Sequence, residues 1–574
     1  MELSIRTIDE VVHPTAAFHL RPLGKTQENP DPAGPDHQPC WEDSLLNPKN
    51  RIDSLDLPEN PLWRVDGCAG MGTQYYTLPL FLTSIPPIRM DVFIPQKQPA
   101  LIREQLDLDK AFHTKDAARL SRLAITRHIV RTLRTWTVDR FQTLDAFEKF
   151  YTRIPFGSRI VFENMALDTR KIQVSVAPNH YLEHQLLPLS RLLELWGSEF
   201  PFPQVIDFFD IHVVSVLHDS VCLARIHGKL FIFKALTSGA KYLYHELKVL
   251  CTLEPHTNII TRPIHIVTKM CHFGGKKAVA GFTTFYHSKG TLRDVLPQWR
   301  IHHQLRAADQ LKWSIQLTSA LEHLRRRSGT YYPDLRLDNI VLSEQSDVVM
   351  VDFEQRGVWC EFAAPEVNAI EYIRLIATDE SIPRDVAAKY WRKLEQLVPA
   401  FEVLTSEQYT NPEFGYNLPW IALSATEQEA AEVYMLGRVL WCIFEGVSGP
   451  QKAAVWQSYR WESDLEFPEY KRTPMAIREL VDQCTRGRRG TLNNLITRQQ
   501  SQLLLRTKSA NEQTADDVKT TAAHFWTTEL EVAEKFLDLR HSLRQRGEWT
   551  DNYYNRPSLG QVLATLEAYQ RETS

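Results

Sequence analysis

The stretch YYPDLRLDNIVLSEQSDVVMVDF, residues 331–353, decides how this sequence is interpreted. It contains Asp334, then Asn339 five residues later and Asp352 thirteen residues after that. The β-prone runs IVL and VVMV separate the last two, which predicts a short hairpin with these three side chains on the loops around it. Single Asp and Asn residues in turns are more often caps or Asx-turns. The joint spacing is what favours a functional site over that alternative.

This set of side chains suits the transfer of a phosphoryl group. Asp334 would accept the proton of an attacking hydroxyl, while the amide oxygen of Asn339 and the carboxylate of Asp352 would coordinate Mg²⁺. Arg336 lies two residues beyond the proposed base and would neutralise charge on the transferred group. We therefore expect Asp334 and Arg336 to be catalytic, and Asn339 and Asp352 to bind the metal.

Upstream, a lysine stands inside an apolar strand pattern. The run KLFIFKAL, residues 229–236, predicts a buried strand that contains Lys234. A single lysine in a strand is usually solvated at an edge. Twelve residues further on, Glu246 lies in KYLYHELKVLCTL, whose leucines form one apolar stripe of a helix. Paired with this glutamate, Lys234 would hold nucleotide phosphates; the alternative is a surface glutamate on the helix.

Together these residues resemble the motifs of the eukaryotic protein kinase superfamily. Lys234 is similar in position to the lysine of the third strand, and Glu246 to its partner on the following helix. TYYPDLRLDNIVL resembles the catalytic loop, with Asp334 as its base, and DFE at Asp352 resembles the D-F-G motif. The sequences YPDLRLDN and VDFEQRG resemble those of a divergent group of kinase-like proteins from filamentous fungi.

Downstream landmarks follow in the same order. AAPEV, residues 363–367, resembles the A-P-E motif and places Glu366 in it. EVYMLGRVLWCIFEG begins at Glu432 and resembles the buried helix that follows, where the family generally has aspartate. RPSLGQVLATLE places Arg556 where the family has the arginine that pairs with the A-P-E glutamate.

The resemblance also implies where a nucleotide binds. GFTTFYHSKGTLRDVL, residues 281–296, resembles the fifth strand and the hinge between lobes. This makes Thr284 the gatekeeper and the backbone of Phe285, Tyr286 and His287 the partner of adenine. Packing in a core would also explain these aromatic residues. ATP and Mg²⁺ are the implied cofactors.

Several positions depart from the family pattern. The turn before the lysine strand, VLHDSVCLAR at 216–225, has no glycine that would let backbone amides approach phosphates closely. Tyr332 and Pro333 replace the His and Arg of H-R-D, and Glu354 replaces the D-F-G glycine. The segment between the D-F-G and A-P-E positions is short. These departures predict weaker ATP binding, no phosphorylation control through H-R-D, and a changed metal preference.

The predicted fold class is α+β, a bilobal protein-kinase-like fold preceded by a separate N-terminal α/β unit. Residues 1–60 are predicted to be loop-rich or partly disordered, residues 61–202 to form an N-terminal domain of unknown function, and residues 203–574 to form the kinase-like domain. Within that domain we expect a small β-rich lobe at about 203–287, a large helical lobe at about 288–574, and insertions at about 367–425 and 487–550.

Local patterns predict four further elements. Leu106 to Trp136 is helix-like, with basic residues interleaved with Leu and Ile that most simply form a solvated face. Ile160 to Ala177 predicts one or two strands, and His180 to Trp196 a helix rich in leucine. Thr514 to Leu543 predicts a helix inside the second insertion.

Composition excludes several classes of protein. A net charge of −4 gives no field for a polyanion, so nucleic acid is not an expected partner. The eight cysteines contain no Cys-x-x-Cys pair and are expected to be reduced thiols. The N-terminus lacks a secretory pattern, and the most apolar run, Val433 to Val447, contains Arg438 and Glu445. We expect an intracellular protein, most simply cytoplasmic with a nuclear location left open, and no membrane partner.

Two weaker motifs have simpler explanations. The run GCAGMG, with Gly67, Gly70 and Gly72, resembles a phosphate loop only superficially, and a tight turn explains it better. The run HYLEH matches the zinc pattern H-x-x-E-H through His180, Glu183 and His184, but five residues match easily by chance.

The expected function is ATP-dependent phosphorylation of Ser or Thr in a protein substrate, because the main residues of the transfer are present. Two alternatives stay open. The first is a pseudokinase or scaffold that keeps the fold, with or without nucleotide binding, which the missing glycine loop favours. The second is a small-molecule phosphotransferase, which the short segment after Asp352 favours but which does not predict the Glu366 and Arg556 pair.

Overall fold

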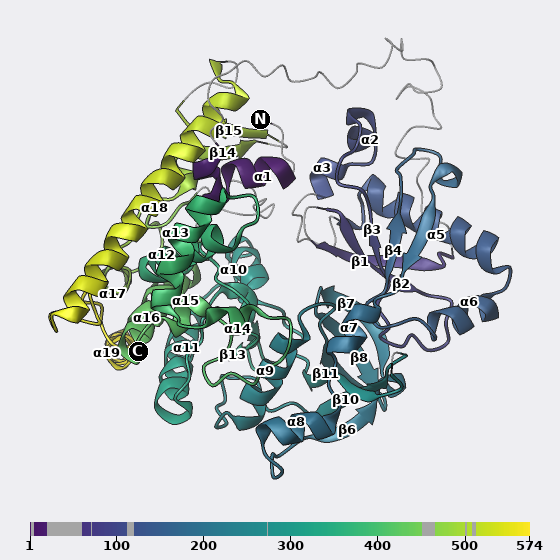
Figure 1. The fold of residues 1–574 in the computed structure, drawn as a ribbon. Coiled ribbons are helices and arrows are strands. Elements are labelled where there is room, and N and C mark those ends of the chain that lie inside the picture. Colours follow the sequence, from purple (N-terminus) through teal and green to yellow (C-terminus); the bar gives the residue numbers. More distant parts are fainter. Residues whose placement is uncertain are drawn as a thin grey trace.

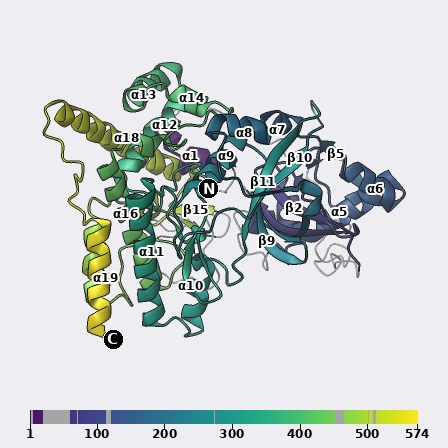
Figure 2. The same ribbon diagram turned by 90° about the horizontal axis from the view of Figure 1, so that it is seen from below.

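The computed structural model describes residues 1, 5–19, 60–69, 72–111, 120–272, 274–450, 465–499, 502–507 and 512–573. They form a mixed α and β protein, which confirms the α+β class at this coarse level. Figure 1 shows two sheets on one side of the molecule and a block of helices on the other, and Figure 2 shows the same division from below. No helix in these ranges is long and apolar enough to cross a bilayer.

The first sheet has five strands in the order β1-β2-β3-β4-β5. All neighbours are antiparallel except β3 and β4. The predicted strands between residues 160 and 177 are confirmed as β4 and β5. The strands are β1 (Trp63–Ala69), β2 (Gln74–Pro79), β3 (Asp91–Phe93), β4 (Arg159–Phe162) and β5 (Val174–Ala177).

Helices α5 (Ala124–Phe141) and α6 (Leu144–Tyr151) pack against this sheet through aromatic residues. The ring of Trp63 on β1 meets Phe147 of α6 edge to face, with centroids 5.6 Å apart. The predicted helix from Leu106 to Trp136 is therefore only partly right. It begins directly after α2 (Ala100–Gln105), its first turn is the separate helix α3 (Leu108–Ala111), and residues 112–119 lie outside the described ranges.

The second sheet has six strands in the order β6-β10-β11-β9-β8-β7. β6 runs parallel to β10 and the other neighbours are antiparallel. The helix α9 (Ala240–Thr252) follows β9 directly in sequence. The strands are β6 (Gln204–Asp207), β7 (His212–His218), β8 (Val221–Ile226), β9 (Lys229–Lys234), β10 (His265–Met270) and β11 (Lys277–Phe285).

The single helix predicted over His180–Trp196 is wrong, because the chain forms two short helices, α7 (His180–Gln185) and α8 (Leu189–Trp196). Pro188 precedes α8 with an extended backbone and interrupts the pattern. Both helices contact the second sheet or its helix α9. A boundary at residue 203 therefore divides these helices from the sheet that they cover.

The helical half has α11 (Ala307–Ser328) and α16 (Ala425–Glu445) near its centre, and α16 is buried from residue 430 to its end. The predicted insertion at 367–425 lies mainly in α12 to α15. The remaining helices are α10 (Leu292–Ile301), α12 (Pro365–Thr378), α13 (Arg384–Leu397), α14 (Phe401–Thr405), α15 (Leu418–Ile421), α17 (Met475–Cys484) and α19 (Leu559–Thr573).

The predicted insertion at 487–550 forms a hairpin and the long helix α18 (Ala515–Gln545). The prediction of a helix here is confirmed, and Thr514 caps it by accepting a hydrogen bond from the backbone of Asp517 at 3.2 Å. The hairpin strands are β14 (Ile496–Gln499) and β15 (Gln502–Leu505).

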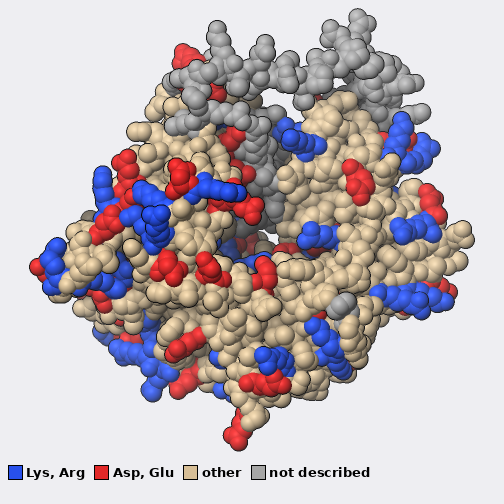
Figure 3. Space-filling view, viewed as in Figure 1, with Lys and Arg blue, Asp and Glu red and all other residues tan. Residues whose placement is uncertain are grey.

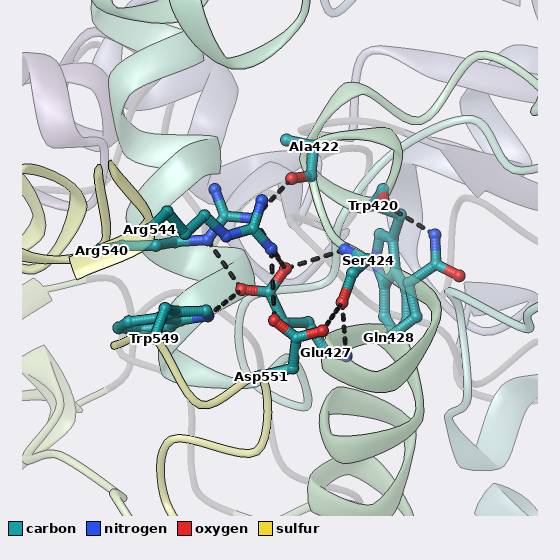
Figure 4. Close-up of polar contacts among 9 residues, drawn as sticks. All are labelled: Trp420, Ala422, Ser424, Glu427, Gln428, Arg540, Arg544, Trp549 and Asp551. Atoms are coloured by element: carbon teal, nitrogen blue, oxygen red, sulfur yellow. Dashed lines mark hydrogen bonds and ion pairs between the residues drawn. The ribbon is translucent and has the colours of Figure 1, made fainter. Parts of the chain in front are cut away.

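A buried ion pair ties α18 to the start of α16 (Figure 4). Arg540 donates two hydrogen bonds to Glu427, from Nε at 2.7 Å and from Nη2 at 2.6 Å. Trp549 and Arg544 also donate to this carboxylate, at 2.9 and 2.8 Å. The backbone amide of Ser424 donates as well, at 2.8 Å, so five hydrogen bonds compensate one buried acid.

The N-terminus differs from the loop-rich segment predicted for residues 1–60. Residues 5–18 form α1 (Ile5–Val11) and the 3₁₀ helix η1 (Pro14–Phe18), which pack on α18. The indole of Trp526 donates to the carbonyl of Val11 at 2.9 Å. Apolar residues of this short segment dock on a helix more than 500 residues away, a contact that local composition does not reveal. Most of the rest of the predicted loop lies outside the described ranges.

The two sheets are joined rather than separate. Asp66 of β1 accepts a hydrogen bond from the backbone of Val216 on β7 at 2.7 Å, and Arg64 donates to the carbonyl of Val214 at 2.7 Å. One continuous cluster of buried apolar side chains runs from Trp63 in the first sheet to Leu566 in α19. The predicted N-terminal unit therefore shares its core with the rest of the chain.

Candidate functional site

Lys234 lies at the centre of a group of three carboxylates. Its Nζ is 2.6 Å from Glu246, 2.6 Å from Asp352 and 3.2 Å from Glu354. The lysine side chain is only 8% exposed. The contact expected between Lys234 and Glu246 is present, and Asp352 joins it across the end of strand β13 (Val348–Met350).

Strand pairing explains why a lysine is buried at this place. Lys234 ends β9, where it pairs with Val221 of β8 and Phe282 of β11. Gly281 permits this close approach, because a Cβ there would lie 2.4 Å from the carbonyl oxygen of Lys234. The apolar face of α9 then carries Glu246 into the interior, where it is 2% exposed.

The charges of this group shift one another. Burial works to lower the pKa of Lys234, but the three carboxylates outweigh it and hold that pKa well above its ordinary value. Burial raises the pKa of Glu246 to about 7 although Lys234 opposes the shift. Burial also works to raise the pKa of Asp352, but Lys234 and Arg336 reverse this and the pKa lies below its ordinary value. Lys234 and Asp352 are therefore charged at neutral pH.

Asp334 lies in the loop before β12 (Ile340–Leu342), and the predicted hairpin of β12 and β13 is confirmed. Asn339 donates from Nδ2 to the Asp334 carboxylate at 2.9 Å and to its backbone carbonyl at 3.0 Å. Arg336 lies 3.1 Å from the same carboxylate. Burial raises the pKa of Asp334 to about 6, against the charge of Arg336.

The backbone around Asp352 is held in a defined turn. Asp352 has a φ of 66°, in the left-handed region that non-glycine residues rarely adopt. The next amide, that of Phe353, donates to Glu246 at 2.9 Å. Tyr332 takes the place of a smaller polar residue expected from the family pattern, and its hydroxyl donates to the carbonyl of Val351. These contacts fix the loop that carries Asp352.

The residues expected to contact adenine lie at the end of β11. Thr284 is inside the strand and 8% exposed, whereas Phe285, its last residue, is 50% exposed. Tyr286 and His287 follow in the loop and are half-buried. Burial lowers the pKa of His287, with Glu344 acting in the opposite direction.

Sequence reasoning missed what holds the turn between β7 and β8. This turn consists of Asp219 and Ser220. Arg89, in the loop before β3, donates to the backbone carbonyl of Asp219 at 2.7 Å, and Gln74 of β2 donates to its carboxylate at 3.3 Å. Arg89 is also paired with Asp91 at 2.6 Å. The first sheet thus fastens the turn that stands where a glycine-rich loop is expected.

Two ion pairs brace the loops on the helical side. Arg556 contacts Glu366 at 2.5 and 3.1 Å, the pair expected from the A-P-E resemblance. Glu432 accepts from the backbone of Tyr332 at 2.7 Å and from Arg325 at 2.8 Å. Burial raises the pKa of Glu432 to about 7.

The described residues of the two weaker motifs make structural contacts. Glu183 is completely buried and bound to Lys269 at 3.0 Å, and it accepts from the amide of His272 at 2.8 Å. This carboxylate is thus engaged in a buried ion pair. Gly72 has a φ of 69° in the turn before β2, while Gly70 lies outside the described ranges.

A cavity with a volume of about 780 Å³ lies beside α9 and α12. Its lining includes Lys241, Tyr242, Arg356 and Arg374. None of Lys234, Asp334, Asn339 and Asp352 lines it, so this cavity is distinct from the group around Lys234.

Comparison with known proteins gives no relative to build on: no family model matches the chain, and no curated protein matches it. Functional conclusions therefore depend on the geometry of these side chains.

Proposed function

We propose that this chain is a divergent protein kinase that transfers the terminal phosphoryl group of ATP to Ser or Thr hydroxyls of a protein. The observation that carries the proposal is the meeting of Lys234 with Glu246 and Asp352, next to the loop of Asp334 and Asn339. Five residues of the kinds that phosphoryl transfer requires come from four separate parts of the chain. Single turns or caps do not account for that convergence.

The proposal extends to the architecture. We assign the six-stranded sheet with α9 to the small lobe of a bilobal kinase-like fold, and the helices from α10 to α19 to the large lobe. Support comes from the order of elements and from the Glu366 and Arg556 ion pair between the two ends of the helical half.

Each side chain has a role in the proposed reaction. Lys234, held by Glu246, would bind phosphate oxygens of ATP by charge-assisted hydrogen bonds. Asp334 would accept the proton of the substrate hydroxyl, and its pKa of about 6 keeps it mostly ionised at neutral pH. Arg336, whose Nε is 3.1 Å from Asp334, would neutralise charge on the transferred group.

The donor atoms near Asp352 suit Mg²⁺. Asn339 uses Nδ2 for both of its side-chain hydrogen bonds, which leaves the amide oxygen without a partner in the described part of the chain. Together with the Asp352 carboxylate it offers hard oxygen ligands of the kind that Mg²⁺ prefers. When bound, Mg²⁺ supplies positive charge that neutralises the ATP phosphates. A bound Mg²⁺ would replace part of the contact between the Asp352 carboxylate and Lys234.

One alternative has a specific observation in its favour. Three carboxylates already surround Lys234, and the turn above it is a two-residue hairpin without glycine that Arg89 fastens. Both features weaken nucleotide binding, as expected for a pseudokinase or scaffold. The small-molecule phosphotransferase has no such observation and explains the Glu366 and Arg556 pair less well.

Two measurements on the purified protein separate these functions. ATP with Mg²⁺ should raise the melting temperature of the wild type but not of Asp352→Asn, because a ligand that binds only the native state stabilises it. Transfer of labelled phosphate from ATP to a mixture of Ser and Thr peptides should occur with the wild type and fall to background with Asp334→Asn. A melting shift without transfer would support the pseudokinase, and no shift at millimolar ATP would contradict the proposal.

A further inference from the structure

Arg438 is a buried cation that has no acidic partner among the described residues. It lies on α16 with 4% of its surface exposed. Its side chain makes one hydrogen bond, which Nη1 donates to the hydroxyl of Tyr434 at 3.0 Å. Its Nε has no hydrogen-bond partner, although that atom is sealed from solvent. The rings of Phe467 and Tyr434 lie 4.7 and 5.7 Å from its guanidinium carbon. No ion pair joins this side chain to a carboxylate in the described ranges.

The contact between α16 and α18 contains a buried arginine that does have an acidic partner. Figure 4 shows Arg540 of α18 facing Glu427 of α16, with two hydrogen bonds to the carboxylate and a third to the carbonyl of Ala422 at 2.8 Å. Arg438 lies eleven residues after Glu427 on α16. A buried guanidinium normally requires such a partner, because removing the charge from water without one is costly.

Arg438 lines a cavity of about 190 Å³ between α12, α16 and α18. The cavity also has two carboxylates. Glu529 is held by Arg489, whose Nη2 lies 2.7 Å away, and Glu361 accepts from the indole of Trp359 at 3.2 Å. Because Arg489 is paired with Glu529, Arg438 is the cation lining this cavity whose hydrogen-bond donors are not all used.

Tyr434 adds a second donor at the same place. Its hydroxyl oxygen accepts from Arg438, while the hydroxyl proton has no acceptor in the described part of the chain. Tyr434 and Arg438 are four residues apart on α16, so they present adjacent donors on one face of the helix. A ligand here must be rich in acceptor oxygens and negatively charged.

We propose that this cavity binds a phosphate group, free or as a monoester, through Arg438 and Tyr434. A phosphate monoester carries close to two negative charges and three acceptor oxygens, which match the unused donors of a guanidinium and a phenol. The volume is sufficient for a phosphate with a few further atoms. No residue of the Lys234 group lines the cavity, so the inference is independent of the proposed function.

Thermal unfolding of the full-length protein tests the inference, with sodium phosphate compared against sodium chloride at equal ionic strength. Phosphate should raise the melting temperature of the wild type by about 2 °C or more once its concentration greatly exceeds the dissociation constant. Arg438→Met keeps the apolar stem and should abolish this phosphate-specific shift. Arg488→Met is the matched control, because Arg488 is paired with Asp482 at the surface and should leave the shift unchanged.

Phosphorus NMR of inorganic phosphate gives a readout that does not depend on stability. The phosphate line should broaden with wild-type protein and stay narrow with Arg438→Met. If that variant fails to fold, Ala533→Leu fills the cavity from α18 and should also remove the broadening. Competition by free phosphoserine but not by a phosphoserine peptide would identify a small metabolite as the source, and competition by both would identify a protein.

Two results would overturn the inference. The first is a wild type without any phosphate-specific shift or broadening, which would leave Arg438 as a structural cation against Phe467 and Tyr434. The second is a shift that Arg438→Met retains, which would place phosphate elsewhere in the molecule.

Discussion

At the scale of single residues, the group around Lys234 carries more negative charge than one lysine can balance. Glu246, Asp352 and Glu354 all lie within 3.2 Å of its Nζ. Glu354 stands where the resemblance expects glycine, and its carboxylate competes with any phosphate for Lys234. It therefore works against the proposed nucleotide binding.

This competition predicts the effect of Glu354→Gln. Removing one negative charge from the group should tighten the binding of ATP with Mg²⁺ by about three- to tenfold, because a nearby like charge costs on the order of 1 kcal/mol even when screened. Isothermal titration calorimetry measures the change. Glu413→Gln, at an exposed position, is the control for a change in net charge and should leave the affinity unaltered. Unchanged or weaker binding in Glu354→Gln would mean that Glu354 does not oppose phosphate.

A second prediction concerns the stability cost of Asp334. Burial raises its pKa from 3.8 to about 6, so the folded state holds its proton more tightly than the unfolded chain. Stability from this group is complete below pH 3.8 and is lost as the pH rises through 6, which makes the carboxylate destabilising at neutral pH. Asp334→Asn should therefore raise the free energy of unfolding at pH 8 by on the order of 1 to 3 kcal/mol while abolishing transfer.

Urea unfolding of wild type and Asp334→Asn at pH 8 and pH 5 measures this effect. The gain should be smaller at pH 5, since the wild-type carboxyl is then largely protonated in the folded state. Asp338→Asn, on the same loop, serves as the comparison. A loss of stability at pH 8 in Asp334→Asn would show that its contacts with Arg336 and Asn339 outweigh the cost of burial.

The sequence predicts most of the residues at this site but not all of their contacts. Lys234 and Glu246 were visible because a charge interrupts an apolar strand and a helix with the right period follows it. The position of Glu354 was visible as a departure from glycine, but its contact with Lys234 depends on the left-handed backbone of Asp352. Arg89 gave no signal, since it lies 130 residues from the turn that it holds.

At the scale of elements, local sequence patterns predicted helices that have clear capping residues. They failed where a short non-helical segment separates two helices. The helix α18 was predicted within two residues because Thr514 caps it and its apolar period is regular. The two helices α7 and α8 were predicted as one, since leucines continue on both sides of Pro188. Packing of α1 on α18 is a tertiary effect that no local pattern predicts.

The turn between β7 and β8 yields a prediction about mobility. Arg89→Met removes the hydrogen bond to Asp219 and leaves Asp91 without its cation, so the hairpin of residues 212–226 should open more often. Hydrogen exchange measured by mass spectrometry should become several-fold faster in that hairpin than in the wild type. Arg225→Met on the exposed face of β8 is the control. Equal exchange in Arg89→Met would show that strand pairing alone fixes the turn.

The ion pair between α16 and α18 yields a prediction about stability. Arg540→Met leaves Glu427 buried with only the donors Arg544, Trp549 and the amide of Ser424, and should cost on the order of 3 kcal/mol of unfolding free energy. Chemical denaturation measures this loss. Arg546→Met, whose ion pair is exposed, should cost less than about 1 kcal/mol. Similar losses in both variants would contradict the assignment of α18 as a helix anchored at Glu427.

At the scale of the whole molecule, the division at residue 203 drawn from motif positions does not coincide with the packing. The short helices before this point contribute to the second sheet, because Glu183 balances Lys269, which is 1% exposed. Between the two helices, the carbonyl of Leu187 accepts a hydrogen bond from the amide of Val279, and its amide donates to the hydroxyl of Tyr244. The spacing of motifs predicts where functional residues lie, but it does not show which neighbouring helices complete the hydrophobic core. Figure 3 shows that basic and acidic side chains are interspersed over this face of both halves.

Two fragments that differ only in α7 and α8 test whether these helices stabilise the second sheet. Residues 178–574 retain α7 and α8, whereas residues 203–574 lose them; both lose the first sheet and its contacts with β7. The shorter fragment leaves the ammonium of Lys269 buried without Glu183, which costs on the order of 3 to 5 kcal/mol, and exposes apolar surface of the sheet. It should therefore melt at least several degrees below the longer fragment or aggregate on expression. Lys269→Met in the shorter fragment should recover part of that loss, because it removes the unpaired charge. Equal melting temperatures for the two fragments would instead make residue 203 a true boundary, with α7 and α8 belonging to the first sheet.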